Sequence, residues 1–333
     1  MGIEVLEVGG LRWPPVLEQG QNKMKIIFFG TSEFAVPSLE QIVASRHKVL
    51  AVVTQPDRKK GRFQQLAAPR VKEAALKLRL PVFQPEDIDD KEFVEKLKQF
   101  SADLFVVVSY GKILKKEILG IPSKFCVNLH GSFLPRYRGA APINWAIING
   151  DETTGVSVIK MNEKMDEGDI ILKKEVPIFS HDTAESLSSR LSDDGSLLLL
   201  EALNCIEKGN FKLEKQDDSK ATYASKLSKE DGLVSWDKDA LNILAHARGV
   251  RPWPGAYTYL SGKLVKICKM SIYGIGRTGK PGQIIGIEKD GILVGTKSGA
   301  IVLEEIQPES SRCMDVNAFL AGHKVRVGDM LGK

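Results

Sequence analysis

The stretch Leu104-Phe105-Val106-Val107-Val108 is apolar at every position. An apolar run without alternation is typical of a strand that is covered on both faces, as in the middle of a parallel sheet. Similar short runs lie on both sides of it, at residues 26–29, 49–54 and 82–83 before it and at 126–129, 156–161 and 170–176 after it. The sequence therefore predicts a largely parallel sheet with this stretch near its centre.

Amphipathic helical patterns separate these strands. Residues 91–100 place Phe93, Val94, Leu97 and Phe100 on one helical face. Further helices are expected from Pro37, at 70–78, near 143–149 and from Thr183 to about residue 207, with Thr183 and Ser186 as capping residues. The alternation of strands and helices predicts an α/β fold, namely a Rossmann-like, doubly wound domain over residues 24–207.

The pattern changes after a polar segment at residues 208–228, which is typical of a linker. One helix is expected near residues 240–247. Short strand-like segments follow it at 256–260, 264–273, 283–288, 292–294 and 300–307. These segments predict a C-terminal domain over residues 229–333, built as a small β-barrel of the oligonucleotide-binding (OB) type.

Composition agrees with two globular domains. The chain has 333 residues, of which 43% are hydrophobic and 27% charged. The formal net charge of +5 permits a nucleic-acid partner without requiring one. Four scattered cysteines form no CxxC pair, so neither a disulfide framework nor a zinc site is predicted.

The hydropathy of the chain and its N-terminal segment indicate where in the cell the protein is expected. No apolar run approaches the length of a membrane helix, and the first 23 residues lack the features of a signal peptide. Gly9-Gly10 and Pro14-Pro15 break any regular element there. We expect a cytoplasmic protein without membrane contact, with its natural start at Met24 and residues 1–23 as a non-native or disordered extension.

Residues 274–280 match GxGxxG and nearly match a phosphate-binding loop. Both motifs need a strand before and a helix after, so that the helix N-terminus meets phosphate. Here Pro281-Gly282 follows, and then a strand-like segment. We interpret the motif as a loop of the predicted barrel.

Asn128 and His130 lie two residues apart at the end of a predicted strand. A period of two places both side chains on one face, at the edge where open α/β sheets bind ligands. A histidine can move protons, and both side chains can donate hydrogen bonds to a developing oxyanion. Taken alone, such a pair is more often a surface histidine beside a turn.

The residues that follow are more specific. The segment from His130 to Pro142 resembles the HGSLLPxxRGxxP signature of the 10-formyltetrahydrofolate-dependent formyltransferases, with Phe133 where that family usually has leucine. Residues 165–170 resemble its second signature, DxGxI. The resemblance implies a catalytic trio of Asn128, His130 and Asp166 and no metal. It also implies that the folate is bound by Ser109, Tyr110, Gly111, Ser132, Phe133, Leu134 and Pro135.

Motifs in both halves of the chain resemble the branch of this family that acts on methionyl-tRNA. They include Gln55-Pro56-Asp57-Arg58, Ala221-Thr222-Tyr223-Ala224 and Arg251-Pro252-Trp253-Pro254-Gly255-Ala256. The resemblance implies transfer of the formyl group of 10-formyltetrahydrofolate to the amino group of initiator methionyl-tRNA. We expect a monomer, since no coiled-coil pattern or long apolar surface helix is present.

Two stretches carry basic residues without acids, at 58–72 and 263–280. A basic run is usually a solvated face, but these two fall on the predicted active-site edge and on the predicted barrel. The expected tRNA contacts are Arg58, Lys59, Lys60, Arg62, Lys263, Lys266 and Lys269, with Arg62 as the main contact of an inserted loop. Trp253 could stack on a base, although a buried core position is the more common one.

Two alternatives remain open at this stage. A formyltransferase acting on a small amine, such as glycinamide ribonucleotide or an amino-sugar nucleotide, would need only the first domain. An RNA-binding protein on a decayed transferase scaffold would be expected to have lost the catalytic trio, which is present.

Overall fold

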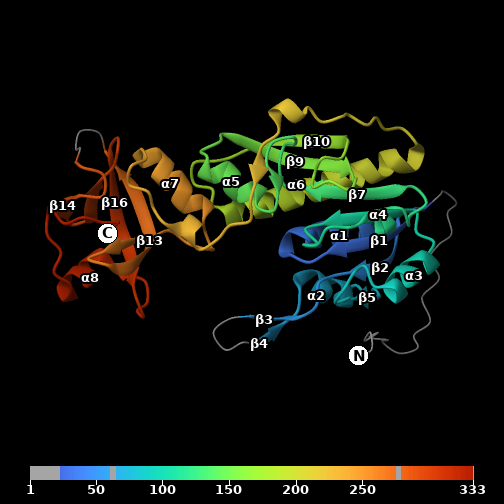
Figure 1. Cartoon of the computed structure of the whole chain (residues 1–333), viewed down its shortest axis with the longest axis horizontal. Helices are drawn as coiled ribbons and strands as arrows, with labels where there is room; N and C mark the ends of the chain where they lie inside the picture. The colour runs from blue at the N-terminus through green and yellow to red at the C-terminus, as the bar shows by residue number, and fades with distance from the viewer. Residues whose placement is uncertain (1–22, 61–64, 275–278, 333) are drawn as a thin grey trace. The chain divides into compact units, whose positions relative to one another are not determined.

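The computed structural model describes residues 23–60, 65–274 and 279–332, and these form two compact units (Figure 1). The first unit comprises the described residues up to Gly139, together with Gly155–Val176 and Ser188–Tyr223. The second comprises Ala140–Thr154, Pro177–Leu187 and the described residues from Ala224 onwards. Residues 208–223, expected to be linker, thus cluster with the first unit. The predicted extension lies, apart from Lys23, outside the described residues.

The first unit is built on a sheet of seven strands in the order β10-β9-β7-β6-β1-β2-β5. The strands are β1 (Lys25–Gly30), β2 (Lys48–Val53), β5 (Val82–Phe83), β6 (Leu104–Val108), β7 (Phe125–His130), β9 (Thr153–Lys160) and β10 (Ile170–Pro177). Pairing from β5 through β7 is parallel, and β7 pairs with β9 in antiparallel fashion. The predicted, mostly parallel sheet is confirmed, and every residue of its central strand β6 is buried.

Helices cover both faces of this sheet. They are α1 (Val36–Ala44), α2 (Arg70–Lys77), α3 (Lys91–Gln99), α4 (Lys116–Leu119) and α6 (Ala184–Lys208). On one face, Phe93 and Leu97 of α3 pack with Phe105 of β6 in a buried cluster. On the other face α6 approaches closely, because a Cβ added to Gly195 would touch the Leu129 side chain.

The predicted caps of α6 are confirmed. The Ser186 amide donates to Thr183 Oγ1 at 3.3 Å, and the Thr183 amide donates to Ser186 Oγ at 3.0 Å. This reciprocal arrangement satisfies two donors at the start of the helix, as in a capping box.

The first basic stretch contains an element that the sequence did not predict. Strands β3 (Arg58–Lys60) and β4 (Gln65–Ala67) pair in antiparallel fashion and form a hairpin. Arg62, which was predicted to be the main tRNA contact of an inserted loop, falls outside the described residues.

The second unit combines helices with a separate antiparallel sheet. The sheet has the order β12-β13-β16-β15-β14, with β17 paired to β16. Its strands are β12 (Tyr257–Leu260), β13 (Lys263–Tyr273), β14 (Ile284–Glu288), β15 (Gly291–Gly295), β16 (Ala300–Pro308) and β17 (Met314–Asp315). The helices of this unit are α5 (Pro142–Ile148), α7 (Ala240–Gly249) and α8 (Val316–Gly322). The predicted strands are all present, whereas β17 and α8 were missed.

The C-terminal residues hydrogen-bond to both edges of this sheet. The Gly332 amide donates to the Tyr259 carbonyl of β12 at 2.8 Å, and the Ile284 amide of β14 donates to the Asp329 carbonyl at 2.8 Å. The antiparallel sheet itself is established, while the finer prediction of an OB-type barrel stays a prediction.

Short elements complete the chain: the strands β8 (Arg138–Gly139) and β11 (Tyr223–Ala224), and the 3-10 helices η1 (Glu33–Ala35), η2 (Asp218–Lys220) and η3 (Glu230–Gly232). Within the described residues, no helix is both long and apolar enough to cross a membrane.

One expectation about the cysteines is corrected. Cys268 and Cys313 form a disulfide, which the sequence did not predict because their separation of 45 residues matches no spacing motif.

Candidate active site

The carboxyl end of β7 places Asn128 and His130. Asn128 pairs with Val107 of β6 and Cys126 pairs with Phe105, and both of these β6 residues face α3 and α4. Because side chains alternate along a strand, Asn128 and His130 point to the same side. His130 is buried and Asn128 is half-buried. The predicted placement at the carboxyl edge of the sheet is therefore observed.

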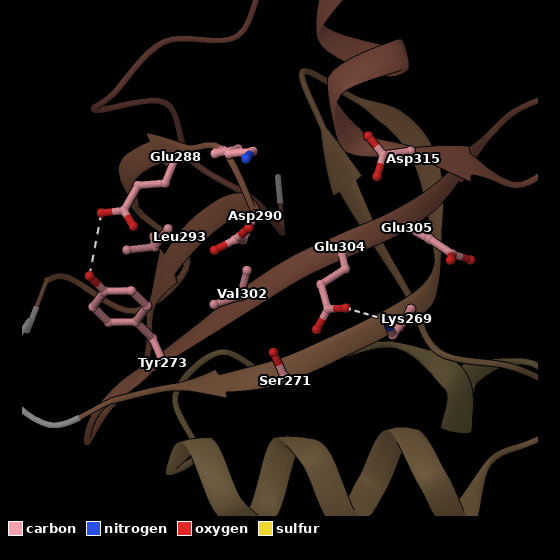
Figure 2. A pocket seen from close by; sticks show the side chains of 11 residues that line it. Lys269, Ser271, Tyr273, Glu288, Asp290, Leu293, Val302, Glu304, Glu305 and Asp315 are labelled. Carbon is pink, nitrogen blue, oxygen red and sulfur yellow. Dashed lines mark hydrogen bonds and ion pairs between the residues drawn. The ribbon is translucent and has the colours of Figure 1, made fainter.

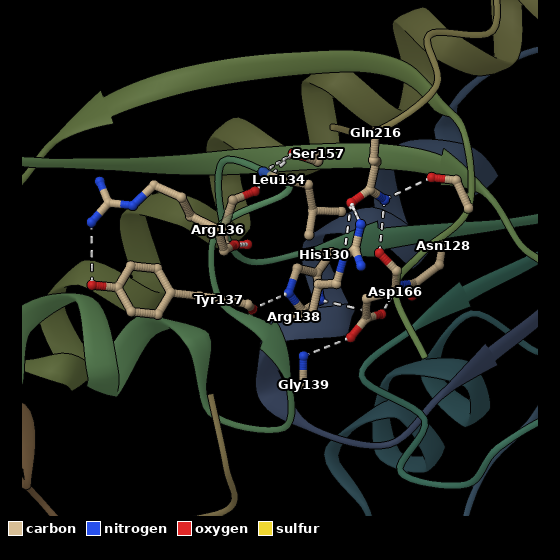
Figure 3. Close-up of polar contacts among 12 residues, drawn as sticks. Asn128, His130, Leu134, Arg136, Tyr137, Arg138, Gly139, Ser157, Asp166 and Gln216 are labelled. Atoms are coloured by element: carbon tan, nitrogen blue, oxygen red, sulfur yellow. Dashed lines mark hydrogen bonds and ion pairs between the residues drawn. The ribbon is translucent and has the colours of Figure 1, made fainter. Parts of the chain in front are cut away.

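Asp166 reaches this pair from the loop between β9 and β10 (Figure 3). Its Oδ1 lies 3.4 Å from Asn128 Nδ2 and 3.6 Å from His130 Nδ1. Its Oδ2 accepts a hydrogen bond of 2.9 Å from the Gly139 amide. The resemblance implied that these three side chains act as a trio, although positions 130 and 166 lie 36 residues apart in the sequence. The structure brings the three side chains together.

A hydrogen bond of the His130 ring shows which of its nitrogens carries a hydrogen. Nε2 lies 2.9 Å from the Tyr137 carbonyl oxygen, which can only accept a hydrogen bond. Nε2 therefore carries a hydrogen. In the neutral ring Nδ1 is then the basic nitrogen, and Nδ1 is the atom that faces Asp166.

The Asp166 loop rests on two residues that sequence analysis missed as functional candidates. Gln216 Nε2 donates to the carbonyls of Asp166 at 2.8 Å and of Gly168 at 2.7 Å. Arg138 donates from Nε and Nη2 to Gln216 Oε1 at 3.0 and 2.9 Å. Gln216 lies within the predicted linker and in none of the motifs identified in the sequence. Its contacts with Asp166, Gly168 and Arg138 are therefore visible only in the structure.

Arg138 is buried but remains a strong cation. Burial alone would lower the pKa of its guanidinium, but hydrogen bonds to Asp218 and Tyr223 and the charges of Asp218 and Glu167 outweigh burial and raise that pKa. In turn, the hydrogen bond from Arg138, 2.7 Å from Nη2 to Oδ1, holds the pKa of the Asp218 carboxyl below its usual value.

The turn after His130 is fixed by a buried serine. Ser157 Oγ of β9 donates to the Ser132 carbonyl at 2.8 Å and accepts from the Leu134 amide at 3.1 Å. The Ser132 and Leu134 side chains are fully buried, whereas Phe133 and Pro135 are half-buried. The Phe133 ring lies 5.1 Å from Lys173 Nζ.

The second predicted folate segment follows β6. Ser109 and Gly111 are exposed, and Ser109 accepts a 2.7 Å hydrogen bond from Ser32 Oγ. The Tyr110 ring is buried edge-on against Phe29, and burial raises the pKa of its hydroxyl. Of the seven residues predicted to bind folate, Tyr110, Ser132 and Leu134 are therefore buried, whereas the other four present exposed or half-buried atoms.

The predicted tRNA contacts differ in their exposure and in whether an acidic side chain pairs with them. Arg58, Lys59, Lys263 and Lys266 are exposed, while Lys60 lies in β3 and Arg62 lies outside the described residues. Lys269 is also exposed, but its Nζ lies 2.6 Å from Glu304. Trp253 is 51% exposed, so the expectation of a buried core tryptophan was wrong.

Lys269 borders a hollow of about 450 Å³ on the C-terminal sheet (Figure 2). Carboxylates predominate in its walls, which include Glu288, Asp290, Glu304, Glu305 and Asp315. Such walls repel phosphate, so this hollow is distinct in charge from the exposed lysines Lys263 and Lys266.

Comparison with known proteins covers most of the chain. A family model described as formyl transferase matches residues 24–203, and another described as formyl transferase, C-terminal domain, matches residues 226–324. Methionyl-tRNA formyltransferase of Geobacter sulfurreducens is 44% identical over 93% of this chain and 97% of its own length. The protein of the same name from Syntrophus aciditrophicus is 45% identical over 93% of this chain and 99% of its own.

Solved structures share the fold. HypX from Aquifex aeolicus in complex with tetrahydrofolic acid matches 92% of this chain and 51% of its own, with a TM-score of 0.62 and 19% identity. WlaRD, a sugar 3N-formyl transferase, matches 88% of this chain and 100% of its own, with a TM-score of 0.64 and 19% identity. At this identity the likeness shows the fold alone. From the family-model matches and the relatives that span nearly its whole length, the chain belongs to the formyl transferase family, in the group of the methionyl-tRNA formyltransferases.

Proposed function

We propose that this chain transfers the formyl group of 10-formyltetrahydrofolate to the free amino group of initiator methionyl-tRNA, giving N-formylmethionyl-tRNA. The observation that carries the chemical part is the convergence of Asn128, His130 and Asp166 at the carboxyl end of β7. The acceptor follows from membership of the methionyl-tRNA formyltransferase group, which extends over both family regions.

The reaction needs an oxyanion stabiliser and a route for one proton. The amine attacks the formyl carbon, the carbonyl oxygen becomes an oxyanion, and the bond from carbon to N10 then breaks as N10 takes up a proton. Asn128 has two amide hydrogens, of which one is directed at Asp166. The other would donate to the oxyanion, an interaction worth about 3 kcal/mol in a preorganised site.

His130 and Asp166 are assigned to the proton. Nε2 is engaged by the Tyr137 carbonyl, which leaves Nδ1 as the atom that accepts a proton from the attacking amine. The Asp166 carboxylate at 3.6 Å would stabilise the positive charge that the ring then carries. The proton returns to N10 as the leaving group departs, so the enzyme is unchanged after each turnover.

The folate would lie along the two loops that end β6 and β7. Ser109, Gly111, Phe133 and Pro135 would present exposed or half-buried atoms to it, while the buried Tyr110, Ser132 and Leu134 would hold the two loops in shape around it. The tRNA phosphates would be bound by Arg58, Lys59 and Lys60 of β3, by Arg62, and by Lys263, Lys266 and Lys269, with Lys269 contributing least because it pairs with Glu304. The protein would act as a cytoplasmic monomer.

One assay tests the proposal. The protein is incubated with 10-formyltetrahydrofolate and initiator tRNA charged with methionine, and formylmethionine is measured after deacylation. Product is expected with the unaltered chain, and at a much lower but measurable rate with Asp166→Asn. Absence of product, together with formylation of glycinamide ribonucleotide or of an amino-sugar nucleotide in parallel reactions, would replace the tRNA assignment by the small-amine alternative.

A further inference from the structure

We infer that Gln216 is a positioning residue for Asp166: its amide holds the Asp166 loop so that the carboxylate faces His130 and Asn128. This inference rests on the proposed function, in which Asp166 supports the proton transfer. Gln216 belongs to none of the signature motifs, and it lies in the chain between α6 and η2.

The Gln216 amide is saturated with hydrogen bonds. A glutamine side chain offers two N–H donors and two acceptor lone pairs. Here Nε2 donates to the Asp166 and Gly168 carbonyls, and Oε1 accepts from Nε and Nη2 of Arg138. Rotating the amide by 180° would set oxygen against two carbonyls and NH₂ against a guanidinium. The orientation of Gln216 is therefore unambiguous.

The loop that Gln216 holds has a backbone conformation that its own sequence does not favour. Asp166 adopts a positive φ of 55°, a left-handed conformation that side-chain-bearing residues rarely occupy. At Gly168 a Cβ would collide with the Lys160 carbonyl, so the chain turns back tightly onto β9 there. A backbone in this conformation keeps it only where neighbouring groups fix it, and Gln216 fixes both carbonyls.

Arg138 orients Gln216 from behind. The guanidinium is buried, and it bonds Asp218 at 2.7 Å besides its two bonds to Gln216. Figure 3 shows Arg138 and Gln216 next to the trio, with the Gln216 amide directed at the Asp166 loop. The neighbouring Gly139 amide donates to Asp166 Oδ2 at 2.9 Å. Gln216 thereby holds the backbone of Asp166, and the Gly139 amide holds its carboxylate.

The central variant is Gln216→Met, which keeps side-chain length and removes all four hydrogen bonds. We expect kcat to fall by about 10- to 100-fold, as for other residues that orient a catalytic group, with little change in KM for folate or tRNA. The matched control is Gln84→Met, which also removes two N–H donors, here to the Gln55 carbonyl and to Asp57. Gln84 does not touch the trio, so its variant should keep kcat.

A second variant covers the case in which Gln216→Met folds poorly. Gln216→Glu keeps the acceptors for Arg138 and strengthens that contact, but it offers no donors to the two carbonyls. The same fall in kcat is expected. Thermal unfolding of each variant establishes that the protein is folded at the assay temperature.

A double variant separates positioning from general support of the fold. If Gln216 acts through Asp166, adding Gln216→Met to Asp166→Asn should lower kcat by less than about twofold further, because residues that work as one unit are not additive. A further loss as large as that of Gln216→Met alone would overturn the inference.

A substrate-free measurement keeps the inference independent of the proposed function. The Gly139 amide hydrogen is bonded to Asp166 Oδ2, so its exchange with deuterium, followed by NMR, reports where the carboxylate sits. Exchange at Gly139 should be faster in both Gln216 variants and unchanged in Gln84→Met. Unchanged exchange in the Gln216 variants would refute the positioning role even if formyl transfer is confirmed.

Discussion

Two groups of polar side chains in this chain are held in opposite ways. Around Asp166 the partners are buried or half-buried, and directional hydrogen bonds fix each of them. Lys263 and Lys266 of β13 are exposed, and among the described residues neither has an ion-pair partner. The first arrangement determines the position of single atoms, and the second provides charge without fixed position.

The difference matches what each group is proposed to contact. Formyl transfer requires reacting atoms to lie within a fraction of an ångström of a productive geometry. Phosphates of a nucleic acid are attracted by positive charge at many geometries, and that attraction weakens as salt is added. Changes in the Asp166 group should therefore act on kcat, and changes in the lysines on tRNA affinity.

The largest effect is expected for His130→Ala. Loss of the group that accepts the amine proton should lower kcat by about 10³-fold, within the range for general acid–base catalysis. Folate binding should persist, because His130 faces Asp166 and Tyr137. Single-turnover formylation and a fluorescence titration with folate measure the two. A variant that turns over normally would remove His130 from the mechanism.

A smaller but still large loss is expected for Gly168→Ala. The added Cβ collides with the Lys160 carbonyl, so the loop must move and carry Asp166 with it. A displacement of about 1 Å at a catalytic group costs roughly 10²-fold in rate. Kinetics on charged tRNA test this.

Gly120→Ala is the control for that variant. Its Cβ would lie 3.4 Å from the Lys116 carbonyl, an ordinary contact, and its φ of −89° suits any residue. It should leave kcat unchanged. Equal losses in the two variants would mean that the Asp166 loop is no more sensitive than an ordinary turn.

The double variant Lys263→Ala/Lys266→Ala should raise KM for tRNA several-fold and leave kcat unchanged. If both lysines contact phosphates, the dependence of log affinity on log salt should become shallower by about 1.5, because two charges are lost. Binding of uncharged tRNA at several salt concentrations measures this slope. An unchanged slope would show that β13 does not contact the phosphates.

Lys269→Ala should have the smallest effect. Its charge is already offset by Glu304, whose Oε2 lies 2.6 Å from the lysine Nζ. The hydrogen bond to Glu304 raises the pKa of the lysine amine, and the paired amine is not available to a phosphate. Exposed pairs of this kind contribute little to stability or binding, because water and salt screen them. Glu304→Gln should instead strengthen tRNA binding, since it releases the lysine. The same titrations compare both variants, and a Lys269→Ala defect as large as the double variant's would contradict this ranking.

The sequence was informative where a single pattern determines structure. The unbroken apolar run of β6 predicted a buried central strand, and the two motif segments predicted which three side chains would meet. Thr183 and Ser186 were identified as caps because capping depends on residues only three positions apart.

The misses share a different cause, which is contact between residues distant in sequence. Gln216 lies in a polar segment with no periodicity, and its role depends on carbonyls about 50 residues earlier in the chain. The pairing of Cys268 with Cys313 depends on the course of the C-terminal sheet. Trp253 was expected to be buried from residue type alone, which says little about one position.

The bonds made by residues 328–332 have a consequence for synthesis of the protein. These residues satisfy backbone groups of β12 at Tyr259 and of β14 at Ile284, strands that leave the ribosome more than 40 residues earlier (positions 284 and 328). Until the last of them has been translated, both edges of the C-terminal sheet present unpaired donors and acceptors that could bind another chain. The first unit can fold while its chain is still being made. The second completes its sheet only after residues 328–332 emerge, and this is the stage at which a nascent chain would most need a chaperone.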